Sequence, residues 1–257
     1  MDGTKLVVVV NYGQVYTSTD SGVTWTARNS LQSWSSVASS SDGTKLVAVA
    51  YDAQIYTSTD SGVTWTARDS TRSWSSVASS SDGTKLVAVV NGGQIYTSTS
   101  GVTWTARESS RVWSSVASSS DGTKLVVAAR WDQVYTSADS GVTWTARDIP
   151  GTWASVASSS DGAKLVAVVA EGQIYTSTDS GVTWTTRESS RVWISVASSS
   201  DGTKLVAAAY WDQVYTSTDS GVTWTARDIS RSWSSVASHG RNKTCSCSKL
   251  WSSVYFN

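Results

Sequence analysis

The chain has 257 residues, 15 of them Trp, with one His, one Met, one Phe and one Pro, and a formal net charge of zero. A zero net charge excludes the basic footprint expected for binding nucleic acid or an acidic membrane surface, and no apolar run approaches the roughly 20 residues of a membrane-spanning helix. Ser, Thr, Val and aromatic residues dominate, which favours an all-β fold.

A ten-residue stretch recurs along the chain, and its clearest form is YTSTDSGVTW at residues 56–65. The period is 40 residues, or 39 where the third copy lacks one residue, and a fixed period of this length indicates a repeat architecture. We number the copies one to six by the tryptophan that ends the stretch: Trp25, Trp65, Trp104, Trp144, Trp184 and Trp224. A second tryptophan starts each Trp-x-Ser-Val-Ala-Ser segment, at Trp34, Trp74, Trp113, Trp153, Trp193 and Trp233.

Copy two shows the expected strands in chain order. Trp34–Ser39 alternates large and small residues, and the turn signal Asp42-Gly43 separates it from the apolar run Lys45–Ala50. Gln54–Ser58 and Val63–Arg68 are predicted as the third and fourth strands. Four short antiparallel strands in about 40 residues are typical of a β-propeller blade. An open solenoid is the alternative, and it is disfavoured because no copy resembles a capping repeat.

The first copy begins at its second predicted strand, Lys5–Val10, and the chain supplies an extra first strand later, Trp233–Ser238. We therefore predict a six-bladed β-propeller over residues 1–238, made of four-stranded antiparallel blades. Trp233–Ser238 is expected to pair with Lys5–Val10, to complete the first blade and so to close the ring, which removes exposed strand edges.

Residues 239–257 depart from the repeat. His239, Cys245 and Cys247 make a poor zinc site at this spacing, and no metal or cofactor is predicted. Codons for this tail can be chosen that read, one nucleotide later, MDGTKLVAVANYGQVYTS, which differs at two positions from the first eighteen residues of the chain. We interpret the tail as a repeat translated in the wrong frame and expect a flexible, non-repeat segment.

The segment from Ser58 to Trp65, which we call the tryptophan turn, follows the pattern Ser-x-Asp-x-Gly-x-Thr-Trp in five copies. Its aspartate and tryptophan are Asp20 and Trp25, Asp60 and Trp65, Asp139 and Trp144, Asp179 and Trp184, and Asp219 and Trp224. Copy three lacks the aspartate and keeps Trp104, so its turn is expected to be the weakest. Because an Asp can bond backbone N–H groups, Gly can adopt unusual backbone angles and Trp can pack between sheets, we expect a structural role.

This pattern resembles the Asp-box (BNR) repeat of sialidase-like propellers, sortilin-type receptors and photosystem assembly factors, and the resemblance covers residues 1–238. It implies a propeller in which the tryptophan turn lies between the third and fourth strands of each blade. In sialidase-like relatives, the face away from these turns carries the site.

Two segments carry most of the differences between copies. One is the hairpin loop between the second and third strands: residues 11–13, 51–53, 91–93, 130–132, 170–172 and 210–212. The other is the link to the next blade: residues 29–33, 69–73, 108–112, 148–152, 188–192 and 228–232. Alternate connections of an up-and-down blade lie on one face, so both segments should form one side, the variable face. The Asp-Gly turns and tryptophan turns should form the opposite side, the turn face.

The variable face is the predicted binding site. Its candidate residues are Tyr12, Tyr51, Asp52, Trp131, Asp132, Glu171, Tyr210, Trp211, Asp212, Arg72, Arg111, Arg191 and Arg231. Exposed aromatics beside charged groups suit a glycan or a protein surface. Unselected drift of loops is the alternative. Copies three and five share Glu-Ser-Ser-Arg-Val-Trp, and copies four and six share Trp-Asp-Gln, so a two-blade unit was duplicated and shared loop residues count once.

The residues argue against an enzyme. The single His excludes His-based triads, and Asp132 and Asp212 lie two blades apart, which disfavours a glycosidase carboxylate pair. Sialidases use arginines on unlike blades, whereas here one arginine recurs at the same register, at Arg28, Arg68, Arg107, Arg147, Arg187 and Arg227. We expect these arginines to cap a strand end or to pair with a carboxylate.

The sequence therefore predicts a monomeric, non-enzymatic module that binds a glycan or a protein, with no nucleic-acid or membrane partner. Two alternatives remain open: an assembly scaffold of the photosystem-factor kind, and a recently amplified array without refined function.

Overall fold

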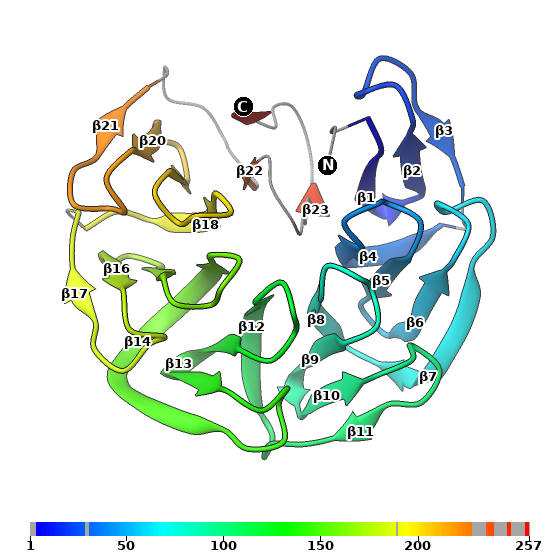
Figure 1. Ribbon diagram of the computed structural model, residues 1–257, viewed down its shortest axis with the longest axis horizontal. Coiled ribbons are helices and arrows are strands. Elements are labelled where there is room, and N and C mark those ends of the chain that lie inside the picture. Colours follow the sequence, from blue (N-terminus) through cyan, green and yellow to red (C-terminus); the bar gives the residue numbers. More distant parts are fainter. Residues whose placement is uncertain are drawn as a thin grey trace.

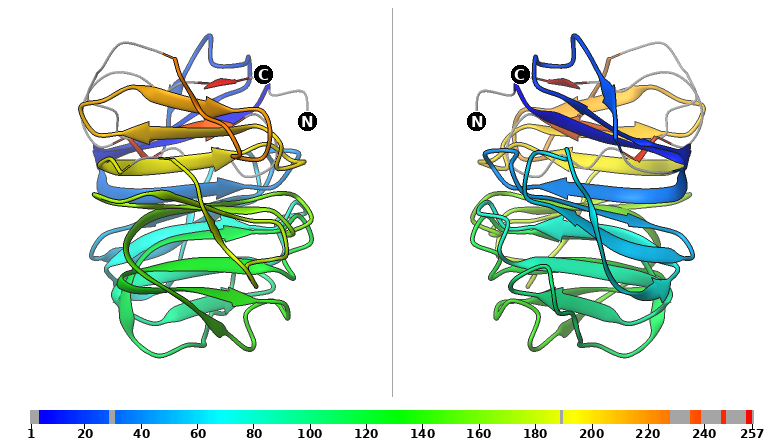
Figure 2. Two further views of the ribbon diagram at one scale, coloured as in Figure 1. Left: turned by 90° about the vertical axis from the view of Figure 1, so that its left-hand side faces the viewer. Right: turned by 90° about the vertical axis from the view of Figure 1, so that its right-hand side faces the viewer.

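A computed structural model describes residues 4–28, 31–188, 190–227, 235–238, 246–247 and 255–256. Every regular element in these ranges is a β-strand, which confirms the all-β class. Figure 1 shows the sheets of successive copies arranged around a common axis, and Figure 2 shows the same arrangement from two sides. No helix in the described ranges is long and apolar enough to cross a membrane.

Each complete copy contributes four antiparallel strands, ordered from the axis outward. The first strands are β4 (Gln32–Ser39), β8 (Trp74–Ser79), β12 (Arg111–Ser118) and β18 (Trp193–Ser198). The second strands are β1 (Leu6–Gly13), β5 (Leu46–Ala50), β9 (Leu86–Gly93), β15 (Leu165–Val169) and β19 (Leu205–Ala209). The third strands are β2 (Val15–Ser18), β6 (Ala53–Ser58), β10 (Ile95–Ser98), β16 (Ile174–Ser177) and β20 (Val214–Ser217). The fourth strands are β3 (Thr26–Ala27), β7 (Thr66–Arg72), β11 (Thr105–Ala106), β17 (Thr185–Thr186) and β21 (Thr225–Ala226).

In copy four, strands that are separate in the other copies run on without a break. Its second and third strands form one element, β13 (Leu125–Ser137), and its fourth strand continues into the first strand of copy five as β14 (Thr145–Ser158). Three short strands follow the sixth copy: β22 (Ala237–Ser238), β23 (Ser246–Cys247) and β24 (Tyr255–Phe256).

The predicted strands of copy two agree with the structure except at the fourth. That strand begins at Thr66 and not at Val63, and it extends to Arg72. Val63 and Thr64 remain in the turn because their backbone N–H groups donate to Asp60, to its carbonyl and its carboxylate respectively. The aspartate thus holds the chain out of the sheet for three residues longer than the apolar pattern indicates.

The core lies between neighbouring sheets. Each first-strand tryptophan from Trp34 to Trp193 is fully buried and meets a tyrosine of the third strand edge-to-face, with ring centroids 5.2–5.3 Å apart. One such cluster joins Val89 and Ile95 of copy three to Trp113 and Val127 of copy four, and Trp144 packs on its outer side. Because each cluster draws on two copies, a single copy cannot bury its apolar surface by itself.

Serines tie neighbouring first strands together near the axis. The Val77 backbone N–H donates to Ser36 Oγ of the preceding copy at 3.3 Å, and the same bond recurs at each following junction as far as Val236 and Ser195. At the Asp-Gly turns, Ser41 N–H donates to the Ser81 carbonyl at 2.6 Å, and three further junctions repeat this bond at 2.7 Å. These bonds satisfy strand-edge groups that would otherwise be unpaired at the centre.

The predicted pairing of Trp233–Ser238 with Lys5–Val10 is wrong for the residues that the structure describes. β22 pairs in parallel with β24, and the edge of β1 pairs in parallel with β23. Trp233 itself lies outside the described residues, as does most of the predicted tail apart from β23 and β24. The physical reason is that β1 lacks a first strand of its own copy, so its free edge can be paired by another extended segment.

The tryptophan turn is held by its aspartate. In copy two, both Asp60 oxygens accept from Thr64, at 2.9 and 3.1 Å from the backbone N–H and 2.6 Å from the hydroxyl, and Ser58 Oγ donates to Oδ1 at 2.8 Å. Gly62 has φ +83°, and a Cβ there would lie 2.8 Å from Thr17 Cγ2. Trp65 Nε1 donates to the Gly62 carbonyl at 3.0 Å. The four other aspartate-containing turns repeat this network, so the aspartates are structural groups.

Copy three loses most of this network with its aspartate. Trp104 Nε1 is buried without a partner, whereas the equivalent nitrogens of the other turns all donate to glycine carbonyls.

Inserting Asp between Thr99 and Ser100 should restore the hydrogen bond from Trp104 Nε1 to the glycine carbonyl. This bond contributes about 1 kcal/mol, so the thermal midpoint should rise by roughly 2–4 °C. Calorimetry measures the shift. Inserting Asn is the control and should recover less, and a lower midpoint with Asp contradicts the prediction.

The aspartates of the tryptophan turns should make the stability of the fold depend on pH in the acid range. Hydrogen bonds from the Thr64 side chain, the Thr64 backbone and then Ser58 lower the pKa of Asp60 from 3.8 to about 2, and the other four turns behave alike. A lowered folded-state pKa stabilises the fold above the unfolded value and loses that effect as the pH falls towards 2. The thermal midpoint should therefore be level above about pH 5 and fall between about pH 4 and 2.

Circular dichroism melts across this range test the expectation. In the variant Asp60→Asn, the destabilisation relative to the unmodified chain should shrink as the pH falls towards 2 and below, because the Asp60 carboxylate then becomes protonated in the folded state as well as in the unfolded state. A difference that stays constant with pH would show that the Asp60 charge is not what stabilises the turn.

Candidate functional site

In copies one to five, the hairpin loop lies against the link that follows it. Asn11 pairs with Ser33, Ala53 with Arg72, Gly93 with Arg111, Asp132 with Gly151, and Gly172 with Arg191. The two segments that vary between copies are therefore joined by backbone pairing at every described junction, and together they form the variable face. The arrangement follows from the up-and-down path of the strands, which returns both connections to the same end of the sheet.

The tip of each hairpin loop has a left-handed backbone. The tip residues Tyr12, Asp52, Trp131, Glu171 and Trp211 have φ between +50° and +63°. Copy three has Gly92 at this register, with φ +71° and no atom within 4 Å of a Cβ built there. Glycine accepts this conformation at little cost, and bulky side chains rarely adopt it. The aromatic tips are thus kept at positions where the backbone favours glycine.

These aromatic side chains are among the most exposed large apolar groups of the face, together with Leu31. Tyr12 is 76% exposed, Trp131 70% and Trp211 67%. Arg130 lies over the Trp131 ring with its guanidinium carbon 5.6 Å from the centroid, and Tyr210 meets Trp211 edge-to-face at 5.7 Å. Arg130 was not among the predicted site residues. Its position next to a tip tryptophan was the available signal, since a cation beside an exposed ring commonly stacks on it.

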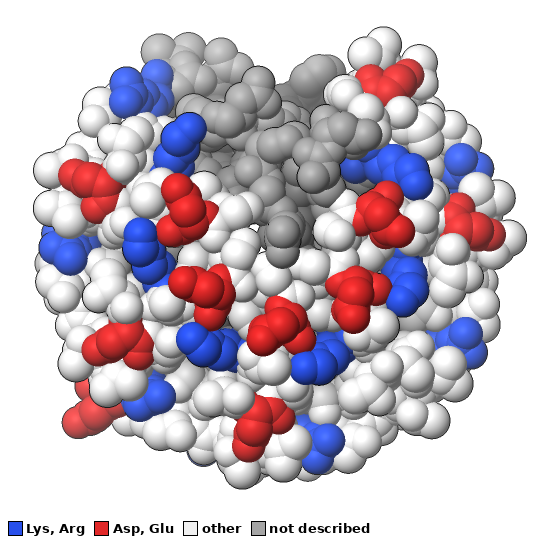
Figure 3. Space-filling model, in the orientation of Figure 1, with Lys and Arg blue, Asp and Glu red and all other residues white. Residues whose placement is uncertain are grey.

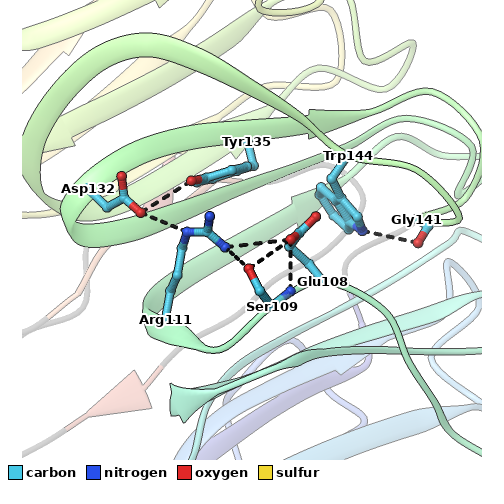
Figure 4. Close-up of polar contacts among 7 residues, drawn as sticks. All are labelled: Glu108, Ser109, Arg111, Asp132, Tyr135, Gly141 and Trp144. Carbon is cyan, nitrogen blue, oxygen red and sulfur yellow. Dashed lines mark hydrogen bonds and ion pairs between the residues drawn. The ribbon is translucent and has the colours of Figure 1, made fainter.

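The predicted charged residues are engaged with one another (Figure 4). Arg111 Nε donates to Asp132 Oδ2 at 2.7 Å, and Tyr135 OH donates to the same oxygen at 3.2 Å. Arg111 also pairs with Glu108 at 3.6 Å, and its guanidinium carbon lies 4.6 Å from the Tyr135 centroid. Burial raises the pKa of Tyr135 further above neutrality, so its hydroxyl is protonated and can donate to Asp132. This group fastens the link between copies three and four to the hairpin loop of copy four.

The same fastening recurs elsewhere. Arg191 pairs with Asp212 at 3.0 Å and donates to Tyr215 OH at 2.7 Å. Arg72 donates to Tyr96 OH at 2.9 Å, and Ser73 Oγ donates to Asp52. Glu171 and Tyr51 are exposed, and Arg231 lies outside the described residues. The structure therefore pairs Arg111 with Asp132 and Arg191 with Asp212, and it leaves the aromatic tips exposed.

The arginine that recurs after each tryptophan turn has the same partner in every copy. Each Nε donates to a threonine hydroxyl of the third strand, at distances between 2.7 and 3.1 Å. None of the six forms an ion pair with a carboxylate in the part of the chain that the structure describes. Of the two expected roles, carboxylate pairing is therefore not found among the described residues, and each arginine is instead bonded to a threonine of the adjoining strand. Within the described ranges, no three His, Cys, Asp or Glu residues are grouped to hold a metal ion.

Neither a protein-family model nor a curated protein sequence matches the chain. Solved structures do resemble it. YCF48 from Cyanidioschyzon merolae superposes with a TM-score of 0.68 at 17% identity, over 90% of this chain and 88% of that one. YCF48 bound to D1 peptide gives 0.68 at 18% identity, over 88% and 79%. An ancestral GH74 enzyme gives 0.69 at 18% identity, over 84% of this chain and 35% of the enzyme.

At these identities the likeness shows the fold alone, which is that of a β-propeller. The chain spans about a third of the length of the GH74 enzyme. One neighbour was solved with a bound peptide and another is an enzyme, so propellers of this shape serve both kinds of function.

Proposed function

We propose that the chain is a non-enzymatic binding module whose variable face binds a segment of a partner protein. In this proposal the six copies are Asp-box repeats that supply six blades, and the disc is closed in solution through C-terminal residues, of which Ser246–Cys247 pair with β1. The observation that carries the proposal is the exposure of Trp131 and Trp211 on left-handed tips where Gly92 stands in copy three.

Backbone strain at an exposed loop tip supports a binding role for the tip side chain, because glycine would relieve that strain. Holding a bulky residue in a sparsely populated backbone region costs on the order of 1–3 kcal/mol. Exposed tryptophan, tyrosine and arginine are the residue types that dominate protein interfaces. The neighbour solved with a bound peptide is consistent with this mode of use.

The engaged charges favour a protein partner over a glycan. Sugar hydroxyls are recognised by free carboxylates and donors beside an aromatic ring, but Asp132 and Asp212 are each bonded to an arginine and lie next to a tyrosine. The surface left for a partner is mainly aromatic, which suits apolar side chains of a peptide.

Two screens in parallel test the proposal. The immobilised chain is exposed to a random peptide display library and to a glycan array. We expect peptides with a shared sequence to be enriched and to be displaced by one another. Enrichment of glycans alone contradicts a protein partner and indicates a lectin. Absence of any enrichment in both screens contradicts a binding role for this face.

A further inference from the structure

The turn face carries a groove at three of the junctions between copies. The groove measures about 10 Å³ between copies one and two, about 100 Å³ between copies three and four, and about 310 Å³ between copies four and five. All three are lined at the same register by a lysine after the Asp-Gly turn and by the start of a tryptophan turn. Figure 3 shows this face, on which acidic and basic side chains alternate around the axis.

The largest groove differs from the others by one residue of its wall. Ala138 occupies the position where Thr19 and Thr99 line the smaller grooves, and the three remaining copies also have threonine there. Alanine lacks the hydroxyl and methyl groups that threonine places in the wall. A volume of about 310 Å³ falls at the lower end of the range of small-molecule sites.

Two cations line this groove and neither forms an ion pair with a described carboxylate. Arg147 Nε donates to Thr136 Oγ1 at 2.8 Å, which fixes the guanidinium and leaves its terminal N–H groups without a protein acceptor in the described part of the chain. Lys124 Nζ donates to Ser180 Oγ at 3.2 Å, so the Ser180 hydroxyl retains its own proton to donate. A fixed guanidinium beside an ammonium and a hydroxyl suits an anion with several oxygens.

Two turn carboxylates near the groove are directed to their own turns. Asp161 precedes the lining residue Gly162, accepts from Ser159 Oγ and the Ala163 backbone N–H, and has a pKa lowered by these hydrogen bonds and, to a smaller extent, by the charge of Lys124. Asp139 is not among the residues that line the groove, and its oxygens accept from the Thr143 backbone and hydroxyl and from Ser137. Those donors offset its charge locally. The groove wall itself therefore presents two cationic side chains with hydroxyl groups and no carboxylate.

We propose that the groove between copies four and five binds a small molecule that carries a tetrahedral oxyanion, a phosphate or sulfate ester, with the oxyanion between Lys124 and Arg147. The alanine at position 138 admits the ligand, and the threonine of the other copies restricts it. This site lies on the face opposite the aromatic tips, so it stands or falls independently of the proposed protein-binding role.

Isothermal titration calorimetry of the full chain tests the site, with inorganic phosphate, inorganic sulfate and glucose 6-phosphate as probes at constant ionic strength and with glucose as the neutral control. We expect saturable binding of one anion per chain. Ala138→Thr restores the residue of the other copies and should weaken binding at least tenfold, as should Arg147→Gln. Arg107→Gln, at the same register in copy three, should leave binding unchanged. Thermal melts of each variant establish that it is folded.

Preference between phosphate and sulfate identifies the ester, and either supports the proposal. It is overturned if none of the anions binds saturably at millimolar concentration. It is also overturned if folded Ala138→Thr binds as well as the unmodified chain, or if Arg107→Gln weakens binding as much as Arg147→Gln, since the attraction would then be non-specific.

Discussion

Replacing Trp131 and Trp211 together with glycine should weaken the binding of a peptide selected on the variable face by at least about 100-fold, because buried tryptophan contacts at interfaces each contribute roughly 2 kcal/mol or more. Both residues are more than two-thirds exposed in the free chain, so their removal uncovers no core. The effect should appear mainly as faster dissociation, as is usual for interface variants.

The same double variant should not lose stability. Glycine relieves the left-handed backbone at φ +63° and +53°, and this gain is partly offset by the larger freedom of glycine in the unfolded chain. We expect the free energy of unfolding to stay level or to rise by up to about 1 kcal/mol at each site. If the double variant loses peptide binding but keeps its thermal midpoint, the tryptophan side chains serve binding and not the stability of the fold.

A matched pair of variants distinguishes side chain from backbone. Trp131→Ala and Trp211→Ala remove the same rings but keep a Cβ in the left-handed region, so binding should fall equally and stability should be lower than in the glycine variant. Retained peptide binding by the glycine variant would show that the tips are not the contact surface. A large drop in its thermal midpoint would show that the tips serve the fold.

Trp113→Ala should destabilise the chain by about 3–5 kcal/mol, which is the usual cost of deleting a buried tryptophan. Trp113 is 1% exposed, contacts Tyr135 edge-to-face at 5.3 Å and joins the clusters of copies three and four. At roughly 2–4 °C per kcal/mol, the thermal midpoint should fall by on the order of 10 °C. Because neighbouring copies share this cluster, amide exchange should accelerate first in copies three and four.

Phenylalanine variants at two equivalent positions refine this test. Trp113 Nε1 is buried without a partner, whereas Trp153 Nε1 donates to the Ile149 carbonyl at 3.2 Å. Trp153→Phe should therefore cost about 1 kcal/mol more than Trp113→Phe, since only the former breaks a hydrogen bond. Equal costs for the two Phe variants, or a shift of less than about 1 kcal/mol for Trp113→Ala, would contradict the view that these clusters hold the copies together.

Periodicity determined much of this protein without coordinates. The spacing of the tryptophans predicts the repeat, and alternation with turn signals predicts strands that agree with β4, β5 and β6 to within two residues. Comparison of the repeated copies also distinguishes the segments that vary from the turns that stay nearly constant. These features are local, because side-chain alternation and turn chemistry act within a few residues of each other.

Only the tertiary structure decided which groups are free. Sequence reasoning placed Arg111 and Asp132 among the ligand contacts. The fold pairs them at 2.7 Å because β12, which begins at Arg111, pairs with the part of β13 that leads into the loop with Asp132. The strand that pairs with the free edge of β1 could not be predicted from the sequence either, because it depends on which extended segment reaches that edge. The groove lined by Ala138 takes its residues from two copies, so it exists only where those copies pack together. Pattern along the chain determines which elements form, and packing between distant copies determines which side chains remain available.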